Sequence, residues 1–447
     1  MVEKLLIANR GEIVNRIIDT CEKMGIRTVA VYSEADRDMP YLERADEAVL
    51  IGPANPVQSY LNIGALMEAA GRTGADSVHP GYGFLSERGA FAEAVEKSGR
   101  TWVGPASGVL RAISSKCYCR SLAHDVGVPV IPGTLAPVTG AAEIAAYGRE
   151  KGWPVFLKLD KGGGGKGIER VESEASASEV FQRAGRIGEM AFGSGACYIE
   201  AVVDQPRHIE VQFLADGHGR CICLGERECS IQRRHQKIVE EAPSVVVTPE
   251  ERLQLYDHVR RIVLKMGYVG AGTIENLRDR DGHYYFMEIN ARLQVEHPVT
   301  EFLTGMDIVQ WQLRIADGQA LDVRQEDVRL NGHAIEARVY AEDPQTFIPS
   351  PGRISALELP EDQEGVRIDH ALKSGGSVPP YYDPLLAKVI AWGRDRSQAI
   401  SKLRQTLEQM RIEGVRNTIA TGLRILDQPR FNQGQIDTGF FDGWINT

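Results

Sequence analysis

The stretches Thr273-Ile-Glu-Asn-Leu-Arg278 and His283-Tyr-Tyr-Phe-Met-Glu-Ile-Asn290 predict two antiparallel strands that decide the fold of the region around them. Asp281-Gly282 lies between them, and Asp-Gly is a preferred centre of a two-residue type I′ hairpin turn. This turn sets a register in which Glu275 lies directly opposite Glu288. Two acidic side chains are therefore expected to meet across neighbouring strands.

This acidic pair predicts a site for a hard divalent cation. Asn290 follows Glu288 by two positions and shares its face of the sheet, because side chains alternate along a strand. Two opposed carboxylates destabilise a bare hairpin, whereas two carboxylates and an amide oxygen are suitable ligands for Mg²⁺ or Mn²⁺. The alternative is a solvated sheet face on which the acids repel each other, and a bulge would change the register. Asn290 and the segment after it favour the metal site.

The next segment, Asn290-Ala-Arg-Leu-Gln-Val-Glu-His-Pro298, predicts an oxyanion site beside the metal. As an extended chain it points Arg292, Gln294 and Glu296 the same way. The guanidinium matches a planar oxyanion, the Gln supplies an amide, and the Glu is a candidate general base. Because a neighbouring Arg lowers the pKa of a carboxylate, Glu296 becomes a better base when a substrate occupies Arg292. A structural ion pair is the alternative for any one of these residues.

The glycine loop Lys161-Gly-Gly-Gly-Gly-Lys166-Gly167 predicts a phosphate contact. It matches G-x-G-x-x-G only because it is all glycine, and the β-like Ile168-Glu-Arg-Val171 that follows argues against a dinucleotide fingerprint, which requires a helix. It also lacks the GK[ST] ending of a Walker loop. Glycine backbone N–H groups can surround phosphates, and Lys158 and Lys166 flank the loop. A plain flexible linker is the alternative.

Two further stretches carry charged residues whose role the pattern leaves open. Gln232-Arg-Arg-His-Gln-Lys-Ile-Val-Glu-Glu-Ala-Pro243 contains the densest basic patch in an acidic protein. It predicts either a nucleotide or oxyanion contact through Gln232, His235 and Lys237 or a solvated surface. In Ala334-Ile-Glu-Ala-Arg-Val-Tyr340 apolar residues alternate with polar ones, so the strand buries one face and presents Arg338 on the other. Whether Arg338 meets solvent or a site stays open at this point.

The rest of the chain reads as an α/β protein of more than one domain. Residues 1 to about 110 alternate short apolar strands with helical patterns, which is typical of a parallel sheet. The block from about 132 to 203 places strands around the glycine loop and is a candidate lid. From about 204 onward long strands dominate, with helical patterns at 248–266 and 396–412.

Composition excludes some classes of function. The 447 residues carry a formal net charge of −10, which argues against nucleic acid as a partner, since phosphate neutralisation needs a basic surface. We find no targeting segment and no apolar stretch long enough to cross a membrane. The seven cysteines include no C-x-x-C pair and are expected to be free thiols in a reducing compartment. The expected location is cytoplasmic.

Taken together, these segments resemble the biotin carboxylase component of biotin-dependent carboxylases, within the ATP-grasp superfamily. The resemblance extends along the whole chain. Its motifs are Ile7-Ala-Asn-Arg-Gly-Glu-Ile13, His79-Pro-Gly-Tyr-Gly-Phe-Leu-Ser-Glu87, the glycine loop, Pro206-Arg-His-Ile-Glu-Val-Gln212, Cys229-Ser-Ile-Gln-Arg-Arg-His-Gln-Lys237 and residues 290–301. It implies an ATP-grasp fold with a Rossmann-like N-terminal domain (1–115), a mobile glycine-loop lid (131–203) and a C-terminal mixed α/β body (116–130 and 204–447).

The resemblance also implies a reaction, the ATP- and bicarbonate-dependent carboxylation of biotin through carboxyphosphate. The implied metal ligands are Glu275, Glu288 and Asn290. The implied ATP contacts are Lys116, Lys158, Gly163, Gly164, Gly165, Lys166, Gly167, Glu200, Val203, His208, Gln232 and His235. The implied bicarbonate contacts are Lys237, Arg292, Gln294 and Val295, with Glu296 as the base. Arg338 would stabilise the biotin enolate, and Tyr82 and Gly83 would help to hold biotin.

Several positions depart from the usual pattern of the resembled family. They are Arg88, Ser115, Lys166, Ala201, Val202 and Asn276. None of them is an implied metal, bicarbonate or base residue. They concern the adenine contacts, the rate and the choice of partner.

The resemblance implies partners as well. The chain contains no Ala-Met-Lys-Met-like segment, so biotin is expected on a separate carrier protein that passes the carboxyl group to a separate carboxyltransferase. A homodimer is expected. The final acceptor, whether acetyl-CoA, propionyl-CoA, pyruvate or another acid, depends on that carboxyltransferase.

Three rival functions fit parts of the pattern. An ATP-grasp ligase that phosphorylates another small acid would keep the metal and the loop but would not depend on biotin. A catalytically silent assembly or regulatory homologue conflicts with the intact set of Glu288, Asn290, Arg292, Glu296 and Arg338. A nucleotide-dependent dehydrogenase lacks the helix that must follow its glycine loop.

Overall fold

The alternating strands and helices at the N-terminus form the expected parallel sheet, whose strand order is β3-β2-β1-β4-β5. The computed structural model describes residues 2–162, 167–360 and 363–442. The strands are β1 (Lys4–Ile7), β2 (Arg27–Ser33), β3 (Glu47–Gly52), β4 (Ser77–His79) and β5 (Thr101–Trp102). The helices and 3₁₀ turns around them are α1 (Glu12–Met24), η1 (Glu34–Asp36), α2 (Tyr41–Arg44), η2 (Pro56–Gln58), α3 (Ile63–Thr73), α4 (Gly89–Lys97) and α5 (Ser107–Ile113).

The order of this sheet reverses between β1 and β4, and loops with functional side chains leave the carboxyl ends of both strands. Such a switch point is where ligands usually bind in open α/β sheets. The Asn9 amide, just after β1, donates to the carbonyls of Pro80 and Tyr82, both at 2.7 Å, after β4. The loop that carries Tyr82 and Gly83 is thereby fixed to the first strand.

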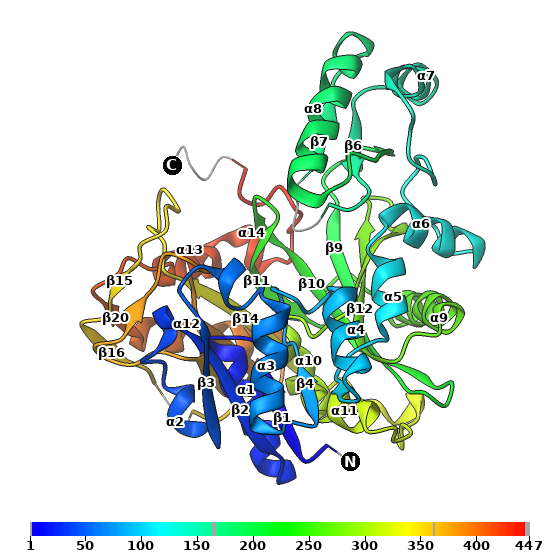
Figure 1. Cartoon of the computed structure of the whole chain (residues 1–447). Coiled ribbons are helices and arrows are strands. Elements are labelled where there is room, and N and C mark those ends of the chain that lie inside the picture. The colour runs from blue at the N-terminus through cyan, green and yellow to red at the C-terminus, as the bar shows by residue number, and fades with distance from the viewer. Residues whose placement is uncertain (1, 163–166, 361–362, 443–447) are drawn as a thin grey trace.

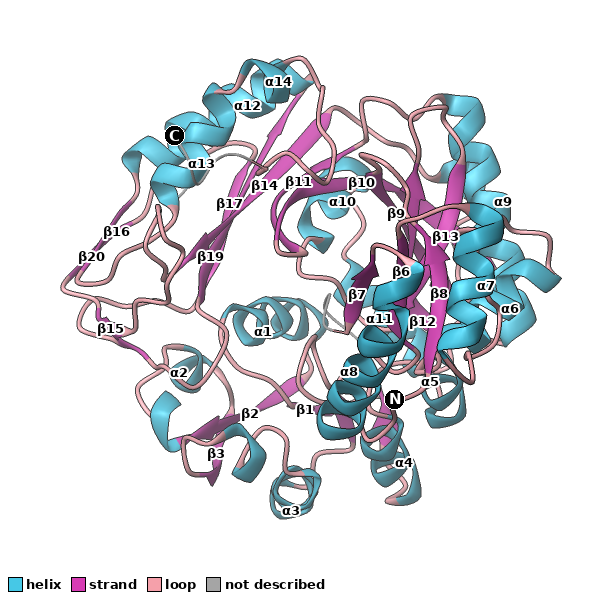
Figure 2. Ribbon diagram, turned by 90° about the horizontal axis from the view of Figure 1, so that it is seen from above, coloured by secondary structure: helices cyan, strands magenta, loops and turns pink. Residues whose placement is uncertain are grey.

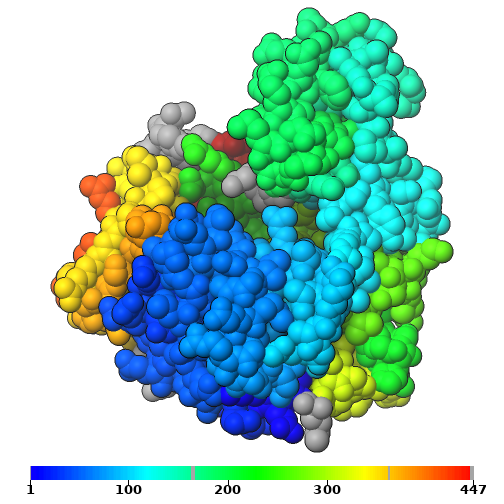
Figure 3. Space-filling view, viewed as in Figure 1, coloured from blue at the N-terminus to red at the C-terminus, as the bar shows by residue number. Residues whose placement is uncertain are grey.

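The block around the glycine loop forms a small antiparallel sheet of its own, in the order β7-β6-β8. Its elements are α6 (Lys116–Asp125), which precedes the sheet, α7 (Ala141–Lys151), β6 (Val155–Leu159), β7 (Ile168–Val171), α8 (Glu174–Phe192) and β8 (Cys197–Ala201). Apolar residues of β6, β7, β8, α7 and α8 form a separate small core. The segment stands above the rest of the molecule in Figures 1 and 3.

The remainder is organised by an eight-stranded sheet in the order β13-β12-β9-β10-β11-β14-β19-β17, in which every neighbouring pair is antiparallel. Its strands are β9 (Arg207–Ala215), β10 (Cys221–Arg233), β11 (Gln236–Ala242), β12 (Gly270–Arg278), β13 (Tyr284–Asn290), β14 (His333–Tyr340), β17 (Val366–His370) and β19 (Leu385–Gly393). The other elements are α9 (Pro249–Met266), α10 (His297–Thr304), α11 (Ile308–Ala316), η3 (Gln325–Asp327), α12 (Arg396–Gln409), α13 (Ile419–Asp427), α14 (Pro429–Asn432) and the short pairs β15 (Gly352–Arg353) with β18 (Ser377–Val378) and β16 (Ala356–Glu358) with β20 (Arg411–Glu413).

The helix expected over 396–412 ends early. α12 stops at Gln409 because Met410 is extended, and Arg411–Glu413 pairs as β20 with β16. The three main sheets fall within the three predicted segments, whose boundaries stay predictions. α1 lies between the N-terminal sheet and the β17 end of the large sheet (Figure 2).

The large sheet buries polar side chains on one face, and this decides where a site can form. Along β9, Ile209, Val211 and Phe213 enter the main apolar core, while His208 and Glu210 alternate with them and face the other way. All of these residues are buried. Buried charged groups must be paired with each other or with ligands, so this polar face is the natural place to look for chemistry.

Candidate active site

The hairpin β12–β13 has the predicted pairing of Glu275 with Glu288 and of Thr273 with Asn290. The expected two-residue type I′ turn is wrong. The Asp279 N–H donates to the His283 carbonyl at 3.0 Å, which leaves a three-residue loop. One residue of β13 then bulges between the partners of Glu275 and Asn276, and this restores the predicted register.

Cations surround the acidic pair of this hairpin. Lys116, at the first position of α6, forms an ion pair with Glu288. Glu275 accepts from the Lys237 ammonium at 3.1 Å and lies 3.2 Å from Nε2 of His208. Burial disfavours the charged form of Glu275, but Lys237 and His208 outweigh burial and hold its pKa well below the usual value. Glu275 is therefore ionised.

The donor set fits a hard divalent ion. The carboxylates of Glu275 and Glu288 lie on one face of the sheet. Burial lowers the pKa of Lys116, but the two carboxylates outweigh burial and raise it, so Lys116 lies near both of them. Asn290 is buried, and its side-chain nitrogen has no hydrogen-bond partner within the described chain. Two carboxylates and an amide oxygen suit Mg²⁺ or Mn²⁺, with phosphate oxygens and water as further ligands.

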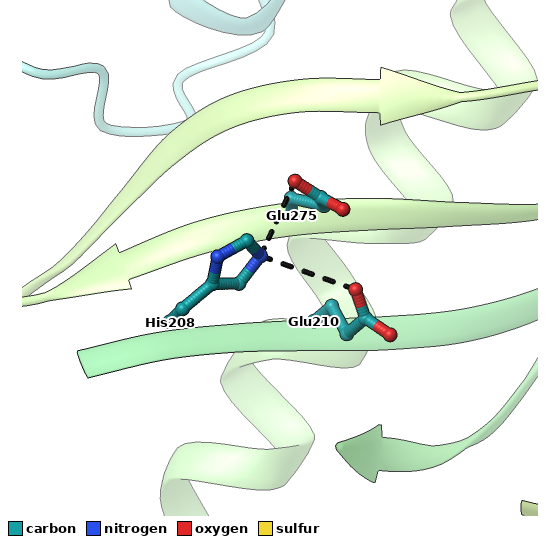
Figure 4. Close-up of side chains that lie close together, drawn as sticks. All are labelled: His208, Glu210 and Glu275. Atoms are coloured by element: carbon teal, nitrogen blue, oxygen red, sulfur yellow. Dashed lines mark ion pairs between the residues drawn. The ribbon is translucent and has the colours of Figure 1, made fainter. Parts of the chain in front are cut away.

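A second group of side chains that could bind a metal ion includes Glu275 of this pair (Figure 4). His208 and Glu210 of β9 and Glu275 of β12 have ligand atoms within 4.8 Å of one another. Both oxygens of Glu210 are already used, by Arg227 at 2.5 Å and Lys237 at 2.6 Å. This cluster is therefore an ion-pair network that supports the neighbouring strand.

The segment after β13 brings its three polar side chains together, although not as an extended chain. His297 N–H donates to the Gln294 carbonyl at 3.4 Å and α10 begins at His297, so the chain turns there. Arg292 donates to Gln294 at 3.0 Å and to Asn290 at 3.2 Å. The side-chain nitrogen of Gln294 lies 3.5 Å from the Glu275 carboxylate. A guanidinium and an amide thus adjoin the metal ligands.

Glu296 lies between two cations from different strands. Its oxygens accept from Lys237 at 2.5 Å and from Arg338 at 2.9 Å. Burial favours the protonated form, but Lys237, Arg338 and Arg227 hold the pKa of Glu296 well below its usual value. The carboxylate is therefore a weak proton acceptor while both cations point at it, and a bound anion that engages them would raise its basicity.

The turn between β10 and β11 contributes the nucleotide-side candidates. Arg234 and His235 both have positive φ angles, 50° and 65°, at a place where neither glycine nor asparagine occurs. Such backbone conformations are uncommon outside functional sites. Gln232 lies 2.8 Å from Nδ1 of His208. Burial, and then Lys158 and His208, lower the pKa of His235, which places its ring near that lysine and that histidine.

The lid contributes the remaining nucleotide candidates. Lys158 of β6 forms an ion pair with the buried Glu200 of β8. Val203 lies in the half-buried connection between β8 and β9. Gly167 has a φ of 82°, and an added Cβ would meet the Leu159 side chain, so the end of the loop requires glycine. The predicted contacts Gly163, Gly164, Gly165 and Lys166 lie outside the described residues.

The N-terminal domain reaches the same region through the loop after β4. The Tyr82 hydroxyl donates to Glu12. Burial and Glu12 raise the pKa of Tyr82 well above its usual value, and Arg338 is near enough to oppose them. Gly83 follows with a φ of 65°. Tyr82 and Arg338 are therefore close to each other. Val295 lies between β13 and α10 in the chain, and its carbonyl accepts from Lys388 at 3.0 Å.

Three supporting residues escaped the sequence reasoning. Glu210 and Arg227 hold the polar face together, and Glu87 accepts from Ala291 N–H at 2.9 Å and from Arg292 at 3.1 Å. For Glu210, the available signal was the alternation of His208, Glu210 and Gln212 with apolar residues. Glu87 belongs to a quoted motif, but nothing in the sequence points it at Arg292.

The departures from the family pattern have local explanations where the structure gives contacts. Ser115 caps α6 by accepting from Tyr118 N–H at 3.1 Å, so it performs the capping that an aspartate would provide before Lys116. Asn276 of β12 donates to the Ile274 carbonyl at 3.3 Å, opposite the bulge in β13. Arg88 occupies the N-cap position of α4, where its side chain makes no capping bond. Ala201 and Val202 are half-buried at the end of the lid.

Fold and site together define a class of enzyme. A parallel N-terminal sheet, a small sheet around a glycine loop and a carboxylate hairpin beside an oxyanion pocket are the arrangement of an ATP-grasp ligase. Comparisons with known proteins agree. The family models "Biotin carboxylase, N-terminal domain", "Carbamoyl-phosphate synthase L chain, ATP binding domain" and "Biotin carboxylase C-terminal domain" match residues 1–110, 115–324 and 336–443.

Relatives and solved structures cover the whole chain. Biotin carboxylase 2 of Bacillus subtilis is 46% identical over 443 residues, which are 98% of this chain and 99% of the relative. The Campylobacter jejuni biotin carboxylase structure matches with a TM-score of 0.96 at 40% identity, covering 99% and 98% of the two chains. The biotin carboxylase domain of Hydrogenobacter thermophilus 2-oxoglutarate carboxylase, solved as a dimer with MgADP and bicarbonate, matches with a TM-score of 0.96 at 42% identity, covering 99% and 97%.

The chain belongs to the biotin carboxylase family. The predicted family, the ATP-grasp α/β fold and the assignment as an ATP-dependent ligase are confirmed by these matches. The family reaction is the ATP-dependent carboxylation of biotin, as the sequence predicted. Among the described residues, no helix combines the length and the apolar character needed to cross a membrane.

Proposed function

We propose that this chain carboxylates biotin carried by a separate protein, with bicarbonate and ATP, through carboxyphosphate. The observation that carries the proposal is the position of Arg292, Gln294 and Glu296 between the metal hairpin and Arg338. An oxyanion bound there would have nucleotide phosphates on one side and biotin on the other. That order of groups suits one-carbon transfer from phosphate to biotin.

The nucleotide would lie between the lid and the large sheet. Its candidate contacts are Lys116, Lys158, Gly163, Gly164, Gly165, Lys166, Gly167, Glu200, Val203, His208, Gln232 and His235. Glu275, Glu288 and Asn290 would hold Mg²⁺ or Mn²⁺, which when bound supplies positive charge to the transferring phosphoryl group. Lys116 now neutralises Glu288 and would turn to phosphate oxygens once the metal takes over that role.

Bicarbonate would replace the internal ion pairs of its pocket. Arg292 and Lys237 would bind its oxygens, together with Gln294 and the Val295 backbone. Because Lys237 and Arg338 are the groups that depress the pKa of Glu296, their engagement by substrates would raise it. Glu296 would then accept the bicarbonate proton, and the oxygen so activated would attack the γ-phosphate.

Biotin would bind on the far side of Glu296. Arg338 would stabilise the negative charge that develops on the ureido oxygen as carboxyphosphate releases CO₂ and the phosphate takes the N1′ proton. Tyr82 and Gly83 would hold the ring system. Both come from the loop that Asn9 fixes to the first strand.

The partners follow from the reaction. We place the biotin on a carrier protein in trans and assign the second half-reaction to a carboxyltransferase. The Hydrogenobacter domain was solved as a dimer, which supports a homodimer for this chain. The described cysteines are buried free thiols, which supports a cytoplasmic location.

The test is phosphate release from ATP by the purified chain with Mg²⁺. We expect release to require bicarbonate and to rise when free biotin is added. Release that is unaffected by omitting bicarbonate would contradict the proposal and favour a ligase for another acid. Absence of any ATP turnover under these conditions would favour the catalytically silent homologue.

A further inference from the structure

A second pair of glutamates lies on the same large sheet, away from the metal hairpin. Glu240 of β11 and Glu336 of β14 are direct cross-strand partners. Both side chains are completely buried, at 0% exposure. Like charges directly opposite each other on neighbouring strands are destabilising, and the cost grows when water is excluded.

The surroundings of this pair are short of hydrogen-bond donors. On its face of the sheet Ala242, Ala334 and Ile390 pack against Val299 and Leu303 of α10, so the covering contact is apolar. Within the described chain, neither oxygen of Glu336 has a hydrogen-bond partner. A buried carboxylate without donors favours its neutral form.

The cation that most affects Glu336 also pairs with other acids. Lys388 of β19 is fully buried, and an ammonium group has three N–H donors. It lies 3.1 Å from Glu12 and 3.3 Å from Asp369, and it donates to the Val295 carbonyl at 3.0 Å. The charge of Lys388 is therefore shared with Glu12 and Asp369, and within the described chain Lys388 forms no hydrogen bond with Glu336.

Glu240 is compensated by a cation that the reaction also needs. Arg338, two residues along β14 from Glu336, forms an ion pair with Glu240 and donates to Glu296 at 2.9 Å. Burial raises the pKa of Glu240 to about 7 against the opposing effect of Arg338. Burial likewise raises the pKa of Glu336 well above its usual value against Lys388.

Other titratable groups face the pair from the surrounding elements. They are Cys229 on β10, Lys237 on β11, Arg338 and Tyr340 on β14, Lys388 on β19 and Glu296 before α10. The nearest cations are shared with other acids, so the pair cannot hold two negative charges cheaply. Two carboxylates in such a site keep one proton between them.

We propose that Glu240 and Glu336 share one proton, and that this singly charged pair positions Arg338 toward Glu296 and the biotin side of the site. The proposal rests on the proposed function for the role of Arg338. With one proton the pair presents a single negative charge, and the guanidinium is divided between Glu240 and Glu296. Loss of the proton at alkaline pH adds a second charge behind Arg338 and draws it away from biotin.

The proton itself can be observed by infrared spectroscopy. At about pH 8, where ordinary carboxyl groups are ionised, we expect the full-length wild-type chain to show the carbonyl stretch of a protonated carboxylic acid. Glu336→Gln should abolish this band, and Glu240→Gln should do the same and serve if the first variant does not fold. The matched control is Glu241→Gln, the next residue on β11, whose carboxylate pairs with His333 and Arg396 and should leave the band unchanged. A wild type without the band, or a band that survives in the folded variant, would overturn the proposal.

The consequence for Arg338 is tested by the pH profile of the biotin-stimulated rate. From about pH 7 to about pH 9, kcat/KM for free biotin should fall about tenfold in the wild type, and this fall should be lost in Glu336→Gln. The biotin-independent cleavage of ATP by the same proteins corrects for effects on the nucleotide side. An identical alkaline fall in both proteins would overturn the positioning role. A wild type with no biotin-stimulated rate at all would instead refute the proposed function, while the infrared band would still decide whether the proton is shared.

Discussion

Two cross-strand pairs of glutamates on the large sheet lie in contrasting surroundings. Glu275 and Glu288 face each other near one edge, on β12 and β13, and Glu240 and Glu336 face each other on β11 and β14. Cations lie against the first pair. Lys116 forms an ion pair with Glu288, and Lys237 forms one with Glu275. The second pair lies beneath α10, and among the described residues Arg338 is the cation that forms an ion pair with it.

The comparison indicates that the neighbouring cations and the solvent access decide whether two opposed glutamates are suited to a metal ion or to a shared proton. At the hairpin, Lys237 and His208 keep Glu275 ionised, and 29% of the Glu288 side chain remains exposed, so a divalent ion with its own ligands can enter. At the sealed pair there is no such access, and the cheaper response is to retain a proton. The predictions below separate the two pairs.

Glu288→Gln should have the largest effect. It removes one charged metal ligand and leaves Lys116 without its partner. Bicarbonate-dependent ATP cleavage should fall about 10³-fold, because charge on the transferring phosphoryl group is no longer neutralised. Steady-state phosphate release measures this, and a fall of less than about tenfold would remove Glu288 from the metal site.

Arg338→Ala should separate biotin chemistry from nucleotide binding. The biotin-dependent rate should fall about 10²-fold or more, because the enolate oxygen loses its cation. ATP affinity, measured by calorimetry, should change by less than about threefold, since Arg338 contacts Glu240 and Glu296. A large loss of ATP affinity would assign the residue to the nucleotide instead.

Glu87→Gln should produce an intermediate effect on bicarbonate alone. It weakens the bond that orients Arg292 from the N-terminal domain. We expect KM for bicarbonate to rise about threefold to tenfold with little change in KM for ATP. Glu93→Gln is the matched control, because Glu93 pairs with Lys97 and Arg111 at the surface. Equal effects of the two variants would reduce the role of Glu87 to general stability.

Glu241 of β11 and Glu336 of β14 should show opposite dependences of stability on pH. Burial opposes charge on Glu241, but His333 and Arg396 hold its pKa at about 2, so it contributes stability that is present above its unfolded pKa of about 4.5 and is lost toward pH 2. Glu336 has a raised pKa, so the stability that its proton contributes is lost as pH rises.

Thermal unfolding of two variants measures this pair of dependences. Relative to the wild type, Glu241→Gln should lower Tm at about pH 6 by a few degrees, and less at about pH 3. Glu336→Gln should raise Tm by about 1–3 °C at about pH 8.5, and less at about pH 6. Parallel shifts of both variants at all pH values would contradict the assigned charges.

Much of the fold could be predicted because its signals are local. Ile168–Val171 is the strand β7 as expected, and the helical pattern at 248–266 is the helix α9, Pro249–Met266. The pairing of Glu275 with Glu288 was also predicted, but only because two departures from the predicted hairpin compensate for each other. The hairpin loop is one residue longer than Asp281-Gly282 suggests, and the bulge in β13 takes up the difference.

The rest of the site depends on contacts that no local pattern contains. Glu87 and Arg292 are 205 positions apart in sequence. In the sequence Glu240 belongs to a charged run, and Glu336 belongs to the polar face of a strand whose surroundings the pattern leaves open. The non-local pairing of β11 with β14 brings these two acids together, and α10 packs on their face of the sheet. The positive φ angles at Arg234 and His235 carry no glycine or asparagine signal.

The most direct measurement of the central claim is binding of Mn²⁺ to the chain in the presence of ADP, followed by electron paramagnetic resonance of the free ion. We predict that the wild type and Glu336→Gln bind Mn²⁺ with affinities that agree within about twofold, and that Glu288→Gln binds it at least about 10-fold more weakly. Undiminished binding by Glu288→Gln, or equal loss in Glu336→Gln, would contradict the account, because the ion would then not distinguish the open pair from the sealed one.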